Sequence, residues 1–103
     1  MNAGSFPRLP DYPVQQRLEI GGISVVLLRV PPAESLPQNI FGLNENGDAL
    51  WQVEPRPSTT PNNKYTSMRD ELGLLVARTE DGAQRKIDAR TGRVLHEEPA
   101  PQT

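Results

Sequence analysis

The chain has 103 residues, the size of one domain, and its net charge of −2 gives no strong field to attract nucleic acid or an anionic membrane. It contains one histidine and no cysteine, which excludes disulfides, thiolate catalysis and cysteine-ligated metal sites. Eleven prolines and eight glycines make up almost a fifth of the residues, so regular elements must be short. We therefore expect one domain with no cofactor, no nucleic-acid partner and no membrane partner.

The N-terminal residues are predicted to form a flexible arm. Residues 1–13 hold Pro7, Pro10 and Pro13 at three-residue spacing, which favours extended or polyproline conformation over packing. No basic stretch followed by an apolar stretch, as in a signal peptide, occurs here. Together with the absence of cysteine, this favours a cytoplasmic location.

The next segment predicts a β-hairpin. Two β-prone runs, Val14 to Ile20 and Ile23 to Val30, are joined by Gly21-Gly22. A primed two-residue turn needs positive φ, which glycine adopts without steric cost. The second run is apolar on both faces and is therefore expected to be a central strand.

A second hairpin is predicted over residues 38–54. The turn from Asn44 to Gly47 contains Asn-Gly, the strongest short-range hairpin signal between alternating hydrophobic residues. Its oxygen-bearing side chains resemble a calcium loop, but the ligand spacing and the terminal glutamate are missing, so we interpret it as a turn. Phe41 and Leu43 are expected on one face of the first strand, and Ala49, Trp51 and Val53 on one face of the second. All five are expected in the core.

The C-terminal half predicts further short strands. A polar, proline-rich loop at residues 55–64 is expected to be mobile and exposed. Turn signals then recur every nine or ten residues, which separates four expected strands: Tyr65 to Arg69, Leu74 to Thr79, Ala83 to Asp88 and Arg93 to Glu97. A helix over residues 65–77 is the alternative, because the apolar residues there have a partial 3.6-residue period. Residues 98–103 are expected to be a flexible tail.

These elements predict an all-β fold. Over residues 14–97 we expect a single antiparallel domain, a small meander or partly closed barrel of about six to eight short strands.

Two segments of the chain resemble each other. Residues 43–51 align with residues 87–96, with one gap, so that Gly47 matches Gly92. The shared pattern is a strand, Asn or Asp, a turn, glycine, and a strand with an aromatic residue or histidine near its end. It resembles the blade motif of quinoprotein-type β-propellers, and the order of segments is similar to short bacterial all-β proteins. A propeller needs about four blades or more, so this chain cannot close one alone, and the resemblance implies no cofactor and no site residue.

Candidate catalytic groups are few. His96 has no second histidine or metal-spaced carboxylate near it, and we interpret it as a surface residue. Asp70 and Glu71 form a carboxylate pair, but in a predicted turn both are expected to be solvated. An enzyme or small-ligand site would require these three residues to meet in one pocket.

Candidate binding residues lie beside the proline-rich loop. Trp51 and Tyr65 flank it, and large aromatic residues next to a mobile loop are common anchors at protein interfaces; burial in the core is the alternative for Trp51. With Arg69, they are the candidate protein-binding residues. Cations concentrate in the C-terminal part without forming a continuous stripe with interleaved aromatic residues. They are Arg78, Arg85, Lys86, Arg90 and Arg93.

The sequence thus predicts a non-catalytic β protein that binds another protein, an accessory or immunity-type module of a bacterium. Unpaired strand edges, which are natural sites of strand addition, support this expectation. One alternative is a self-assembling structural protein that forms a homo-oligomer through propeller-like units. The other is an enzymatic or small-ligand-binding module.

Overall fold

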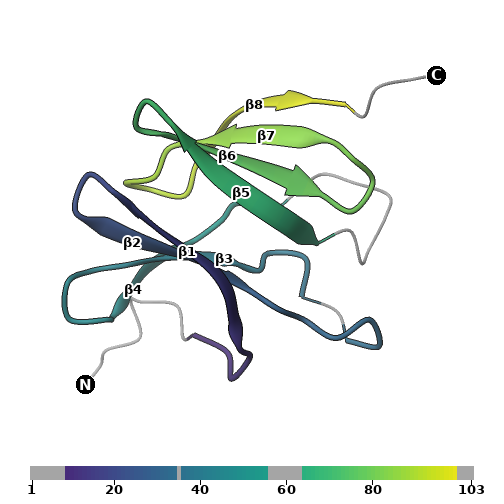
Figure 1. The fold of residues 1–103 in the computed structure, drawn as a ribbon, viewed down its shortest axis with the longest axis horizontal. Helices are drawn as coiled ribbons and strands as arrows, with labels where there is room; N and C mark the ends of the chain where they lie inside the picture. The colour runs from purple at the N-terminus through teal and green to yellow at the C-terminus, as the bar shows by residue number, and fades with distance from the viewer. Residues whose placement is uncertain (1–8, 35, 56–63, 100–103) are drawn as a thin grey trace.

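The computed structural model describes residues 9–34, 36–55 and 64–99, and within them it contains eight strands and no helix. The first sheet has the order β1 (Val14–Ile20), β2 (Ile23–Leu28), β3 (Ile40–Leu43) and β4 (Ala49–Gln52). The second sheet has the order β5 (Tyr65–Glu71), β6 (Leu74–Thr79), β7 (Gln84–Ile87) and β8 (Val94–Glu98). Each is an antiparallel meander, and the two sheets lie one against the other (Figure 1). The all-β meander is confirmed, neither sheet closes into a barrel, and the alternative helix over residues 65–77 is wrong.

The predicted turn chemistry accounts for the hairpins. Gly21 and Gly22 connect β1 and β2 with φ of 56° and 84°, which is the positive φ that a primed turn needs. The Asn44 side chain accepts hydrogen bonds from the backbone N–H groups of Asn46 and Asp48, both at 2.9 Å, and closes the β3–β4 turn. The hairpin predictions are confirmed, and the bounds of β1 and β6 match the expected ones to the residue.

Both sheets carry β-bulges at the same places. The first strand of each sheet has one extra residue near its start, Gln15 in β1 and Thr66 in β5. The last strand of each has another, Leu50 in β4 and Leu95 in β8. The strands therefore correspond residue by residue, and the repeat between the two turn segments extends over both whole sheets.

The main core lies between the sheets. The bulge at Leu50 turns Trp51 towards the second sheet and leaves Ala49 on the other side of the first. The expectation that Ala49, Trp51 and Val53 share one face is therefore wrong for Ala49. The buried residues between the sheets are Ile20, Val25, Leu27, Ile40, Trp51, Val53, Tyr65, Met68, Leu75, Ala77, Ile87 and Ala89.

A smaller apolar cluster lies on the outer side of the first sheet. Tyr12 and Leu36, which belong to no strand, pack against it, and the Arg29 N–H donates to the Pro13 carbonyl at 2.8 Å. Tyr12 and Pro13 thus contact the sheet, in place of the free arm expected up to residue 13. The cluster consists of Val26, Leu28, Phe41, Leu43 and Ala49. The prediction of a flexible arm also covers residues 1–8, which lie outside the described residues. So do residues 56–63 of the predicted mobile loop and residues 100–103 of the predicted flexible tail.

The two sheets stack in the same sense, like two copies of one layer. Phe41, on the outer side of the first sheet, has the same register position as Arg85, which lies on the inner side of the second. The inner row of the first sheet, Leu18, Val25, Gly42 and Trp51, corresponds to an outer row of the second sheet, Arg69, Val76, Lys86 and His96. One row of the repeat is therefore covered by a sheet, whereas its equivalent lies on the outer side of the second sheet, with Arg69 and His96 exposed, Lys86 half-buried and Val76 buried.

Candidate protein-binding surface

Trp51 joins the two sheets. Its side chain is 6% exposed, and its indole N–H donates to the Ala89 carbonyl at 2.9 Å. Two glycines make the room for the ring, because a Cβ on Gly42 would lie 2.2 Å from Trp51 Cε2 and one on Gly92 would lie 2.4 Å from Trp51 Cε3. Trp51 therefore holds the sheets together and does not reach the surface.

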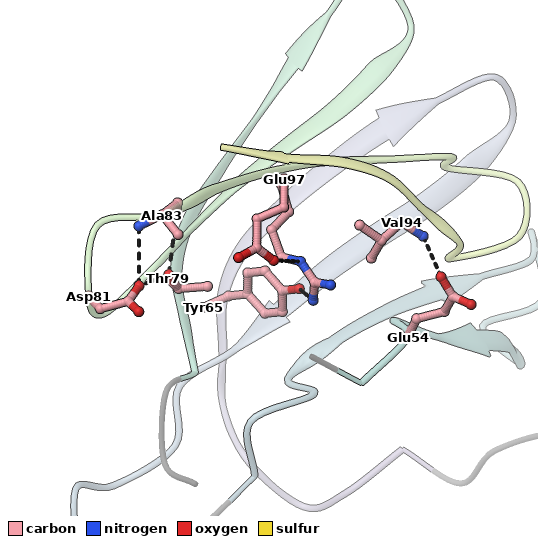
Figure 2. A network of polar contacts seen from close by, with 8 residues as sticks. Glu54, Tyr65, Thr79, Asp81, Ala83, Val94 and Glu97 are labelled. Atoms are coloured by element: carbon pink, nitrogen blue, oxygen red, sulfur yellow. Dashed lines mark hydrogen bonds and ion pairs between the residues drawn. The ribbon is translucent and has the colours of Figure 1, made fainter. Parts of the chain in front are cut away.

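Tyr65 is buried as well, beside a buried arginine. Its hydroxyl accepts a hydrogen bond of 2.7 Å from Arg85, whose Nε lies 2.9 Å from Glu97 Oε1 without the alignment of a hydrogen bond (Figure 2). The Arg85 side chain is only 4% exposed, so the charge needs these partners. Of the three candidate binding residues, the structure thus places Trp51 and Tyr65 inside and only Arg69 outside.

Polar contacts brace the ends of the second sheet around this pair. The Thr79 hydroxyl donates to Asp81 at 2.5 Å, and Asp81 also accepts the N–H of Ala83 in the β6–β7 turn (Figure 2). Glu54, just after β4, accepts the N–H of Val94 at 2.7 Å and so ties the first sheet to β8. These groups serve the fold, since each of these contacts ties a turn or a strand of the second sheet in place.

Side-chain amides from the first sheet cover the edge of β5. The Gln16 amide donates to the Met68 carbonyl at 2.6 Å and accepts the Met68 N–H at 3.0 Å. Asn39 makes the same pair of bonds with Tyr65, both at 2.9 Å. Each amide thus replaces a neighbouring strand, so this edge is closed to strand addition at those two residues.

The possible catalytic residues do not meet. Asp70 and Glu71 lie near the end of β5 and His96 lies in β8, and these strands are opposite edges of the second sheet, roughly 14 Å apart at ordinary strand spacing. Asp70 accepts the Gly73 N–H at 2.8 Å, and Glu71 pairs with Arg69 at 2.6 Å. Among the described residues no three His, Cys, Asp or Glu side chains are grouped so that they could hold a metal ion.

The outer side of the second sheet, which we call the open face, is a polar surface. Its middle row crosses all four strands as Arg69, Val76, Lys86 and His96, and Arg78 lies in the next row. Arg69, Arg78 and His96 are exposed and Lys86 is half-buried. The side chains of the open face are Ser67, Arg69, Glu71, Leu74, Val76, Arg78, Gln84, Lys86, His96 and Glu98.

The open face is more positive than the rest of the chain. It carries three cations against two carboxylates, whereas the whole chain has a net charge of −2. Arg69 is engaged by Glu71 and by Gln84 Oε1 at 3.2 Å, so Arg78 and Lys86 are the cations best placed to meet a partner. Such a surface attracts acidic groups on another macromolecule.

Two large apolar side chains stand out at the margin of this face. Leu95, at the β8 bulge, is 58% exposed, although the corresponding Leu50 packs against the core. Leu72, at the tip of the β5–β6 hairpin, is fully exposed and has a φ of 55°. The left-handed conformation costs a leucine about 1 kcal/mol or more. Sequence reasoning missed both residues, although Leu72-Gly73 stands in a turn where the first hairpin has Gly21-Gly22.

Comparison with known proteins gives a family and nothing further. A family model described as a domain of unknown function (DUF7957) matches residues 9–99. Neither a curated protein nor a solved structure matches the chain significantly. The described part of the chain holds no helix with the length and apolar character of a membrane span.

Proposed function

We propose that this protein, which belongs to the DUF7957 family, is a non-catalytic module that binds another protein on its open face. One observation carries the proposal. The row that is packed against a sheet in the first half of the molecule lies on the outer side of the second sheet in the second half, where Arg69, Lys86 and His96 replace Leu18, Gly42 and Trp51 around the buried Val76. A surface built to be covered, but made of charged groups, fits a partner that brings opposite charges.

The partner that fits is an acidic protein surface. Arg78 and Lys86 lie around the buried Val76, so a carboxylate-bearing partner would find cations around a small apolar centre. Electrostatic attraction of this kind sets the association rate and the choice of partner more than the final affinity.

A second copy of this chain fits less well. To continue the stack, a second copy would have to cover the open face with the side of its first sheet that corresponds to the inner side of the second sheet. That is the outer side of the first sheet, where Tyr12 and Leu36 already pack on the apolar cluster. The homo-oligomer remains the competing hypothesis, and the mass of the protein in solution tests it.

We place the module in the bacterial cytoplasm as an accessory or immunity-type protein. The support is the cysteine-free composition and the similarity of segment order to short bacterial β proteins. The catalytic alternative loses support because Asp70 and His96 lie at opposite edges of one sheet.

Site-specific photo-crosslinking in the producing cell tests the function. A photo-crosslinking amino acid in place of Ser67, an exposed residue of the open face, samples that face with Arg78 and Lys86 still present, and the same amino acid in place of the exposed Glu45 samples the opposite half of the molecule. We expect one protein to be captured at position 67 and not at position 45. The captured protein is then purified and titrated against the full chain by calorimetry.

Matched charge reversals make the titration decisive. The variant Arg78→Glu with Lys86→Glu should weaken binding by about tenfold or more, because both cations face the partner. The control, Arg17→Glu with Arg29→Glu, changes the net charge equally at two exposed positions, one in β1 and one just after β2, and should leave the affinity within about twofold. Equal losses in both double variants, capture of nucleic acid instead of protein, or no capture at position 67 would overturn the proposal.

A further inference from the structure

Leu72 is best understood by comparison with its counterpart in the first sheet. Gly21 and Leu72 are the first turn residues of equivalent hairpins, with φ of 56° and 55°, and Gly22 and Gly73 follow at 84° and 89°. The backbone is the same, but only the second hairpin puts a branched side chain into the left-handed conformation. The first hairpin shows that the turn needs no side chain there.

The Leu72 side chain does not stabilise the fold of its own chain. Its side chain is fully exposed, whereas the turn is already held by the Asp70 carboxylate, which accepts the Gly73 N–H at 2.8 Å. A strained residue that stabilises nothing in the folded protein is typical of a contact made outside it. We infer that Leu72 is an apolar anchor that inserts into a pocket of the protein bound on the open face. This inference rests on the proposed function.

The neighbouring residues indicate the chemistry of that pocket. Glu71 and Leu74 flank the turn and pair with each other on the open face, so a partner on that face meets the hairpin at its margin. Asp70 and Glu71 are exposed next to the leucine, with Arg69 as their one cationic neighbour in the strand. The matching site is therefore an apolar pocket with a basic group at its rim, beside an acidic surface that covers the cations.

The two hairpins projecting from the same side of the molecule supply matched variants (Figure 1). Leu72→Asn creates Asn-Gly, the preferred pair for this turn, and should raise the urea midpoint while weakening binding of the partner captured at position 67 by about tenfold or more. Leu72→Met keeps the apolar contact and should bind within about threefold of the natural chain. Gly21→Leu copies the strain into the first hairpin and should lower the midpoint without changing the affinity.

The outcomes separate this inference from the proposed function. If the captured partner binds Leu72→Asn as tightly as the natural chain, Leu72 is not an anchor, although the open face still is a binding surface. If Leu72→Asn unfolds at lower urea than the natural chain, the strain on which the inference rests is absent. If no protein is captured at position 67, both proposals fail together.

Discussion

The two sheets share one backbone plan and differ in what covers them. At the same register position, Trp51 of the first sheet is buried between Gly42 and Gly92, while His96 of the second sheet is exposed opposite Lys86. The strand pairing and the bulges are the same, so they cannot explain the difference. Side-chain choice alone decides whether a position in this repeat builds the core or stays at the surface.

The opposite sides of the sheets show the reverse pattern. Phe41 is buried in the outer cluster of the first sheet, and the corresponding Arg85 is buried between the sheets with Tyr65 and Glu97 as partners. In an open-ended stack of identical sheets, the positions of Phe41 and Arg85 would have the same surroundings and would need the same kind of residue. The stack ends in the polar open face on one side and in the cover of Tyr12 and Leu36 on the other.

The test with the largest expected effect removes the indole ring of Trp51, which joins the two sheets. Trp51→Ala should lower the free energy of unfolding by about 3–5 kcal/mol, the usual cost of removing a buried aromatic side chain. Urea denaturation followed by circular dichroism measures it. The matched variant His96→Ala should stay within about 0.5 kcal/mol of the natural chain, because nothing packs on that position. Similar losses in the two variants would show that the equivalent positions are not used differently.

A second test concerns the buried arginine. Glu97→Gln should cost about 2 kcal/mol, less than a fully buried pair because the Glu97 side chain is 34% exposed. Adding Arg85→Met removes the orphaned charge and gives this position an apolar residue, like Phe41 in the first sheet. The double variant should therefore be more stable than Glu97→Gln alone, as measured by chemical denaturation. A double variant less stable than the single one would contradict this account.

A third test concerns the two ends of the stack, the open face and the cover of Tyr12 and Leu36. Light scattering after size-exclusion chromatography should give the mass of one chain from micromolar to millimolar concentration. Replacing both cover residues, Tyr12→Ala with Leu36→Ala, should lower the urea midpoint and cause concentration-dependent association through the uncovered cluster. A defined oligomer of the natural chain would favour self-assembly over the binding of an unlike partner.

The smallest expected effect is a pH dependence in the cover. The Tyr12 hydroxyl donates to the Glu34 carboxylate, and this hydrogen bond raises the pKa of Tyr12 above 10.0. A raised folded pKa means that the contribution is complete below pH 10 and is lost as the pH rises through the folded pKa. The stability difference between the natural chain and Tyr12→Phe should therefore shrink above pH 10. A difference that grows with pH in denaturant titrations would reverse the sign.

Local turn chemistry carries most of what the sequence predicts about the fold. Gly21-Gly22 marks one hairpin because few residue pairs adopt positive φ twice in succession, and Asn44 and Gly47 mark the other through the Asn44 side-chain bonds and the φ of 86° at Gly47. Alternation between faces is less secure, since a single extra residue at Leu50 moves Ala49 to the other side of the sheet. Bulges leave no clear composition signal, so alternation alone cannot place Ala49 on the correct side of the sheet.

The open face could not be predicted because it exists only across strands. Arg69, Lys86 and His96 are far apart in the sequence and are aligned only by the register of four strands. Alternation correctly separates Arg85 from Lys86, but it cannot say which of them is buried. Large size and aromatic character suggested Trp51 and Tyr65 as binding anchors, and the same properties also suit the core in which they lie.

The backbone N–H of Met68, which the side-chain amide of Gln16 holds, is an internal probe of how the two sheets separate. The Met68 N–H is bonded to that side chain, 52 residues away in the sequence, and not to a neighbouring strand. Parting of the sheets, with each still intact, would expose this proton to solvent, while protons inside the β6 ladder would stay protected. Native-state hydrogen exchange at Met68 therefore reports the free energy of undocking, and exchange at Val76 reports that of melting the second sheet.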